Sequence, residues 1–123
     1  MSAETSVIKE TGSILEDAKK LASRFKNSDL YKDYCRYKNK LEIEDPPLME
    51  RVRAYKKSQI DLEVKRLKEG HLINLGEEKQ VAYEYTELSL HPTAGAFLAL
   101  EFELLELYRK TLDVICEACE IEL

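Results

Sequence analysis

Residues 94–108 of this chain read AGAFLALEFELLELY, and this stretch decides the fold. Its apolar side chains cover most of the circumference of a helix, which is typical of an element buried on several sides. Pro92 opens the stretch at a position where helices favour proline, and the apolar stripe continues through Leu112 and Ile115. The pattern predicts a long C-terminal helix that is the most buried element of the protein.

The N-terminal part of the chain predicts an amphipathic helix. Its start is expected either at Ser13, which has Glu16 in capping-box spacing, or further back near Thr5, and its end at Asn27–Ser28. The apolar residues recur at helical spacing: Ile14, Leu15, Ala18, Leu21, Ala22 and Phe25.

Three further helices are expected between these two. One follows Ser28 as N-cap and ends before Pro46, and the next starts there with Asp45 as cap. That helix of roughly 22–24 residues, about 35 Å long, ends at Gly70. A loop over residues 71–76 leads into a shorter helix over residues 77–89.

No strand-like alternation competes with these patterns, so the chain is expected to be all-α. We expect one domain over residues 1–123, an antiparallel helical bundle of about five helices of which two are long. Helices of that length carry more apolar stripe than 123 residues can cover. Self-association is therefore expected, most simply as a two-fold homodimer.

Composition excludes several classes of protein. The chain is 44% hydrophobic and 35% charged, as in a globular domain, and its four glycines and three prolines are too few for a collagenous or turn-rich chain. It shows neither a signal peptide nor an apolar run of the roughly 20 residues that a membrane span requires. Three cysteines form no disulfide framework, so we expect a cytoplasmic protein with reduced thiols and no membrane partner.

Charge is divided unevenly along the chain. Residues 1–70 carry 16 basic and 13 acidic side chains, whereas residues 71–123 carry 3 basic and 11 acidic ones. The two parts should therefore attract each other or partners of opposite sign, and the acidic part is a poor candidate for binding nucleic acid.

The sharpest local pattern is Cys116-Glu-Ala-Cys119. Residues three apart share a helix face, so both thiols could serve one metal ion or pack together as small apolar residues in the core. A structural zinc ion or an iron–sulfur cluster is usually coordinated by four protein ligands. Because this pair supplies only two, a metal site here requires cysteines from two chains. A redox role is disfavoured because the pair lies at a helix C-terminus.

A second pattern combines aromatic and basic residues. Three tyrosines (Tyr31, Tyr34 and Tyr37) alternate with basic side chains that include Arg36, Lys38 and Lys40. Such a surface can stack bases and follow phosphates, so a direct RNA-binding protein is one hypothesis. Tyrosines at helical spacing are more often core residues, which makes nucleic acid the less favoured partner.

No enzyme motif is present. The two histidines, His71 and His91, have no carboxylate or cysteine at ligand spacing, and His91 is expected to cap the last helix. Glu101 interrupts the apolar run of that helix and is expected to form a salt bridge with a lysine or arginine of the second or third helix. We therefore predict no catalytic residues and no cofactor in the isolated chain.

The order of these segments resembles the YlbF/YmcA (YheA-like) family of small helical bacterial regulatory proteins. The resemblance extends from about residue 12 to residue 119. It is carried by the Tyr-x-x-Tyr pair Tyr31–Tyr34, the acidic-Pro turn at Asp45–Pro47, Gln59, Gly70 and Glu101.

The resemblance implies a self-associating adaptor without catalytic activity. Some members of that family join a paralogue and a third protein in a complex that acts with ribonuclease Y, tunes RNA processing and thereby affects competence, biofilm formation and sporulation. Cysteines of that complex ligate iron–sulfur clusters. Only Cys116 and Cys119 fall near the corresponding region here, and the longer cysteine-rich tail of the cluster-bearing members is lacking.

Overall fold

The computed structural model describes residues 3–69, 75–120 and 122, and all secondary structure in these ranges is helical. The helices are α1 (Ala3–Lys26), α2 (Asp29–Glu44), α3 (Pro46–Glu69), α4 (Leu75–Leu90) and α5 (Pro92–Ala118). The all-α prediction is confirmed. Three of these helices are long rather than the expected two, because α1 has 24 residues, as many as α3.

Capping side chains set three of the helix starts. The Ser28 hydroxyl accepts a hydrogen bond from the backbone N–H of Tyr31 at 3.2 Å, and Asp45 Oδ1 accepts one from Leu48 at 3.2 Å. His91 Nδ1 lies 3.3 Å from the backbone nitrogen of Thr93 and caps α5. All three caps were predicted, because capping depends on local chemistry.

The structure decides between the two expected starts of α1 and changes one other boundary. The Ser13 capping box is not used, because α1 continues through it; its described part begins at Ala3, close to the alternative start near Thr5. Helix α4 begins at Leu75 and so takes up the end of the predicted 71–76 loop. The rest of that loop, with Gly70 and His71, lies outside the described residues.

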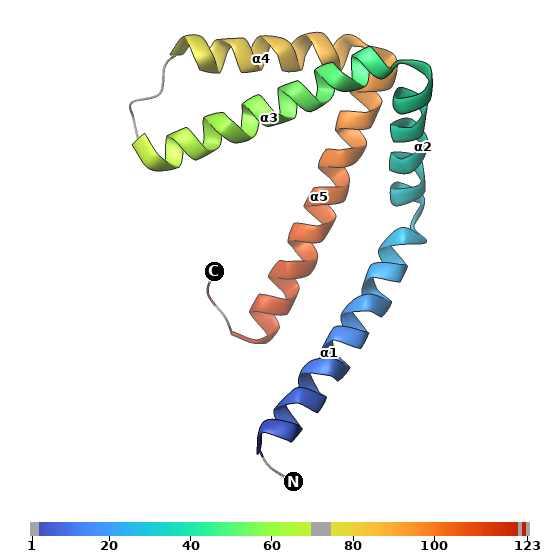
Figure 1. Ribbon diagram of the computed structural model, residues 1–123, viewed down its shortest axis with the longest axis vertical. Coiled ribbons are helices and arrows are strands. Elements are labelled where there is room, and N and C mark those ends of the chain that lie inside the picture. The colour runs from blue at the N-terminus through green and yellow to red at the C-terminus, as the bar shows by residue number, and fades with distance from the viewer. Residues whose placement is uncertain (1–2, 70–74, 121, 123) are drawn as a thin grey trace.

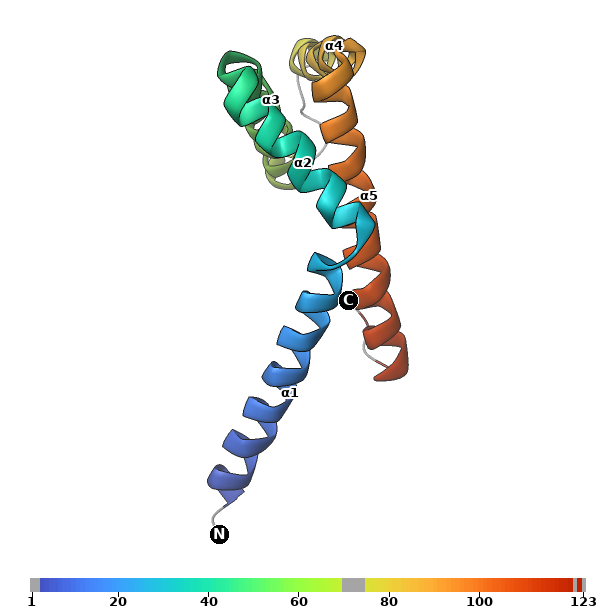
Figure 2. The same cartoon turned by 90° about the vertical axis from the view of Figure 1, so that its right-hand side faces the viewer.

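The helices form an open, angular arrangement (Figures 1 and 2). Helices α3 and α4 form an antiparallel hairpin at one end, and α5 runs away from the hairpin alongside α2 in the opposite direction. Helix α1 precedes α2 and extends away from the core. The N-terminal half of α1 and the C-terminal half of α5 are the free halves of these helices, and they diverge as the two legs of a V.

The core lies where α2, α3, α4 and α5 meet. It consists of Leu41, Leu48, Met49, Val52, Tyr55, Leu88, Ala94 and Phe97. The prediction that α5 is the most buried element was wrong for the part of the helix beyond the core, since Phe102 is 66% exposed, Leu105 is 56% exposed and Val114 is 64% exposed. Beyond the core only one side of α5 is covered by this chain, so its apolar circumference reaches the surface.

No helix in the described ranges is long and apolar enough to cross a membrane.

Candidate interaction surface

Ion pairs use much of the basic surface of α3 internally. Arg51 lies 2.8 Å from Glu84 and Arg66 lies 2.7 Å from Glu78, so both pairs join α3 to α4. The predicted attraction between the two parts of the chain is therefore confirmed. The arginines of these ion pairs belong to residues 1–70 and the glutamates belong to residues 71–123.

Glu101 forms the predicted salt bridge. Its Oε2 lies 2.7 Å from Lys56 Nζ, and the side chains are 16% and 39% exposed. The contact joins α3 to α5 beside the core. Glu101 is thus held by a structural ion pair.

The predicted basic surface of α2 is not one surface. Arg36 and Lys40 are four residues apart and share a helix face, whereas Lys38 lies about 200° around the helix from each of them. Arg36 is also engaged: its guanidinium lies 3.2 Å from Asp33 and 5.3 Å from the centre of the Tyr37 ring.

The tyrosines of α2 are largely turned to the core. Tyr34 stacks on Phe97 with 5.3 Å between ring centres, and Tyr37 also packs against the core. Burial raises the pKa of Tyr34 above its ordinary value of 10.0, and the Glu101 carboxylate adds to the shift, so the hydroxyl is neutral at pH 7. A ring held in the core is not available to stack on a base.

The two candidate metal ligands lie at the free end of α5. Cys116 is half-buried and Cys119 is exposed. The interpretation of both as core residues is therefore wrong for Cys119, whose side chain is exposed to solvent. Among the described residues, no group of three or more histidine, cysteine, aspartate or glutamate side chains could hold a metal ion. Within these ranges one chain therefore does not supply a zinc or cluster site.

An apolar cleft opens where α1, α2 and α5 meet. It has a volume of about 450 Å³. Two of its lining residues, Phe25 and Tyr108, meet edge to face with 4.8 Å between their ring centres. Its walls are Ala18, Leu21, Ala22, Phe25, Lys26, Tyr31, Tyr108, Thr111, Leu112 and Ile115.

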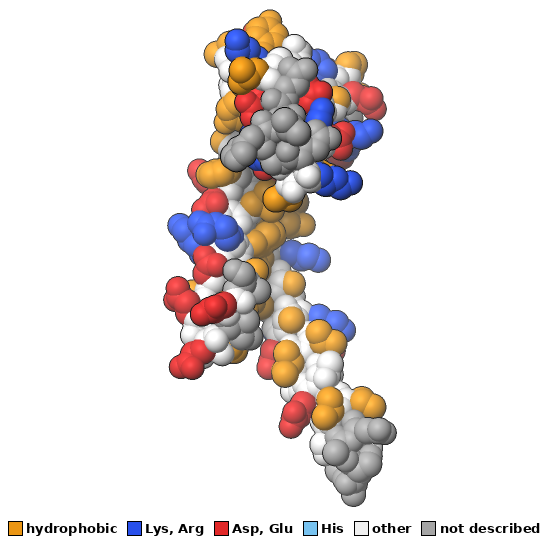
Figure 3. Space-filling model, turned by 90° about the vertical axis from the view of Figure 1, so that its left-hand side faces the viewer, with side chains coloured by type: hydrophobic (Ala, Val, Ile, Leu, Met, Phe, Trp, Pro, Cys, Tyr) orange, Lys and Arg blue, Asp and Glu red, His pale blue; other side chains and the backbone are white. Residues whose placement is uncertain are grey.

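Exposed apolar side chains also lie on both legs of the V outside the cleft lining. On α1, Ile8 is 70% exposed and Ile14 is 66% exposed; on α5, Val114 is 64% exposed. Figure 3 shows hydrophobic side chains along the free leg of α1 and where the legs join. Sequence reasoning identified these stripes and expected part of them to remain uncovered by this chain, but not which part, because an amphipathic pattern does not say which molecule covers it.

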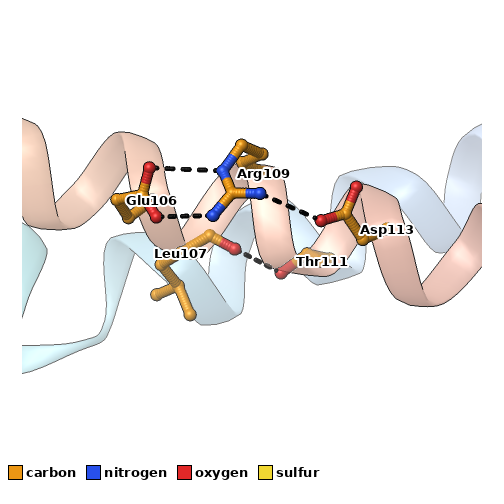
Figure 4. Close-up of polar contacts among 5 residues, drawn as sticks. All are labelled: Glu106, Leu107, Arg109, Thr111 and Asp113. Carbon is orange, nitrogen blue, oxygen red and sulfur yellow. Dashed lines mark hydrogen bonds and ion pairs between the residues drawn. The ribbon is translucent and has the colours of Figure 1, made fainter. Parts of the chain in front are cut away.

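The free half of α5 is supported by charges on its own surface. Figure 4 shows Arg109 held by Glu106 through two hydrogen bonds of 3.2 and 2.7 Å and by Asp113 at 3.3 Å. The hydrogen bond from Arg109 holds the pKa of Glu106 below its ordinary value of 4.5. These i,i+3 and i,i+4 contacts favour the helix where tertiary packing is sparse.

A second groove lies between α3 and α4. It encloses about 500 Å³ over Tyr55, Leu62 and Val81. Ion pairs cross between the two helices along it, Arg51 with Glu84 and Lys65 with Glu77 at 3.2 Å.

Comparison with known proteins gives one family. The model described as "Control of competence regulator ComK, YlbF/YmcA" matches residues 14–119. A UPF0342 protein of Caldicellulosiruptor saccharolyticus is 28% identical over 109 residues, which cover 89% of each chain. A UPF0342 protein of Desulfitobacterium hafniense is 28% identical over 106 residues, 86% of this chain and 84% of that protein. No solved structure matches the chain significantly.

Proposed function

This chain belongs to the YlbF/YmcA family, and on that premise we propose that it is a non-catalytic regulatory protein that acts by binding other proteins. The family description concerns control of a competence regulator and names no catalytic activity.

The observation that carries the proposal is the excess of exposed surface. The chain exposes 9608 Å², whereas a compact monomer of 14.3 kDa exposes about 6,800 Å². The excess of about 2,800 Å² is larger than the roughly 800 Å² that each partner buries in an interface of standard size. Because exposed apolar side chains lie along both α1 and α5, this surface is suited to partner binding rather than to solvent.

The partners we propose follow from the family. They are a second copy of the chain, a paralogous member of the family and proteins associated with ribonuclease Y, so that the protein would modulate RNA processing and developmental states such as competence, biofilm formation and sporulation. The exposed faces of α1 and α5 would act as the adaptor surface.

Affinity purification of the tagged protein from its host, under anaerobic conditions, tests the proposal. Mass spectrometry should identify a paralogue together with ribonuclease Y or its associates. The matched variants are Leu105→Asp, which places a charge on the apolar face of α5, and Lys110→Asp, which places the same residue at an already charged position. The partners should be lost with Leu105→Asp and retained with Lys110→Asp. Recovery of the tagged protein without any of these partners would contradict the proposal.

A metal-dependent sensor is the second candidate. The exposure of Cys119 and the half-exposure of Cys116 at a free helix end favour it, because thiols there can be shared with another chain. Iron and zinc should then be absent from the isolated protein, be present in the anaerobically purified complex, and be lost with Cys116→Ser and Cys119→Ser. A complex free of both metals would rule this candidate out.

A further inference from the structure

Helix α1 lacks the packing that a helix of its length needs. Every described side chain from Thr5 to Lys20 is exposed, and α1 meets the rest of the chain at its C-terminal end through Leu21 and Phe25. In proteins most helical stability comes from packing of an apolar face rather than from intrinsic propensity. The face of α1 therefore requires a cover from outside this chain.

The apolar face of α1 has the spacing of a coiled coil. Its positions alternate by four and three residues: Val7, Thr11, Ile14, Ala18, Leu21 and Phe25. Ile8, Leu15 and Ala22 widen this seam at every seventh position. Thr11 is compatible with an apolar seam, because its hydroxyl donates to the carbonyl oxygen of Val7 at 2.9 Å. A seam with this heptad spacing is suited to another helix with the same repeat.

The distribution of charge along α1 favours a second copy of α1 as its partner and an antiparallel orientation of the two helices. Residues 9–17 contain three acidic side chains and one basic one, whereas residues 18–26 contain four basic side chains and no acidic one. A parallel copy would place like charges together, and an antiparallel copy places the acidic part of each helix on the basic part of the other. We infer that α1 is the self-association helix of this protein and pairs antiparallel with α1 of a second copy around a two-fold axis.

The seam also fixes the register of the pair. In an antiparallel coiled coil centred near Glu16, Ile14 meets the small Ala18 of the second copy, and Val7 meets Phe25. Large residues thus face small ones at the centre, which allows close packing. At the edge of the seam Glu10 faces Arg24 of the second copy, and this contact occurs twice.

The apolar cleft fits the same arrangement. An antiparallel second copy brings its Val7 and Ile8 to the C-terminal end of α1, where the cleft of about 450 Å³ opens between α1 and the Leu112 and Ile115 side chains of α5. By symmetry, each chain fills the cleft of the other. This inference rests on the proposed function, since it names one partner for the same exposed surface.

The test is sedimentation equilibrium of the full chain over a range of concentrations. The wild-type chain should be a dimer, and Glu10→Arg or Arg24→Glu alone should each weaken the dimer about tenfold, because each substitution makes two like-charge contacts per dimer. The double variant Glu10→Arg/Arg24→Glu should restore the wild-type affinity. Circular dichroism confirms that each variant remains helical, and Lys9→Glu, on the outer side of α1, serves as the control that leaves the affinity unchanged.

Cross-linking checks the direction of the helices. In a background with the native cysteines replaced by serine, chains bearing Thr11→Cys should form disulfides with chains bearing Leu21→Cys and not with each other. Disulfides between two Thr11→Cys chains, or single variants that the double variant does not rescue, would overturn the antiparallel pair. A monomeric wild-type chain that still captures protein partners would overturn the dimer and leave the proposed function standing; a dimer that captures none would do the reverse.

Discussion

Lys56 Nζ of α3 lies 2.7 Å from Glu101 Oε2 of α5, at the edge of the core. Replacement of the lysine by Lys56→Ala leaves the more buried carboxylate without its ion pair. We expect a loss of about 1 kcal/mol in the free energy of unfolding, since the half-exposed lysine is partly screened by solvent. Urea denaturation followed by circular dichroism measures this loss.

Two further variants show whether the lost stability comes from the ion pair or from shortening a lysine side chain. Lys57→Ala removes the exposed neighbouring lysine and should leave stability nearly unchanged. Lys56→Met/Glu101→Leu removes both charges and should be more stable than Lys56→Ala, because no uncompensated carboxylate remains. If Lys56→Ala were as stable as the wild type, the contact would have no structural role.

Gly95 permits the tight turn between α4 and α5. A Cβ atom at this position would lie 2.5 Å from the carbonyl oxygen of Ser89, which is backbone and cannot move aside alone. Gly95→Ala should therefore lower the free energy of unfolding by about 1–3 kcal/mol, despite the better helix propensity of alanine.

Gly12 supplies the matched control for this prediction. A Cβ atom there has nothing within 4 Å, so Gly12→Ala in exposed α1 should raise stability by up to about 1 kcal/mol. Thermal unfolding of the two alanine variants should shift the midpoint in opposite directions. A shift in the same direction would mean that the turn at Gly95 can relax.

Sequence predicted the turns of this fold better than the coverage of its faces. Ser28, Asp45 and His91 each cap the helix that follows, and a cap needs only a few neighbouring residues. The apolar stripe of α1 did not indicate in the same way whether its own chain or another molecule covers it. Ile14 carries the same helical pattern whether its own chain or a second molecule covers it, so its 66% exposure could not be foreseen from periodicity.

The candidate site residues show the same limit. Arg36, Lys38 and Lys40 are close in sequence, but the helix separates Lys38 from the other two. The spacing of Cys116 and Cys119 places both near the end of one helix, and only the tertiary structure shows that Cys119 is exposed there. Sequence spacing thus identified neighbours on one helix and not their surroundings.

Direct RNA binding should be weak if these α2 residues are its basis. We expect fluorescence anisotropy with a labelled single-stranded RNA to show little affinity at physiological salt, because the basic residues are divided between two faces and the tyrosine rings pack inward. Charge reversal at Arg36, Lys38 and Lys40 should then change nothing. A salt-sensitive affinity that this triple variant abolishes would instead support the RNA-binding hypothesis.

Glu106 and Arg109 make the free half of α5 sensitive to acid. The hydrogen bond from Arg109 lowers the pKa of Glu106 in the folded chain below the value of 4.5 expected when it is unfolded. A lowered folded pKa means that the stabilisation is fully present above pH 4.5 and is lost as the pH falls through the lowered value. An NMR titration of the Glu106 carboxyl should show a midpoint below 4.5 that Arg109→Ala returns toward 4.5. Lys110→Ala should raise the midpoint much less, because Lys110 acts on Glu106 only through a weaker charge interaction. Equal shifts in the two variants would show that net charge, and not the Arg109 hydrogen bond, sets the pKa.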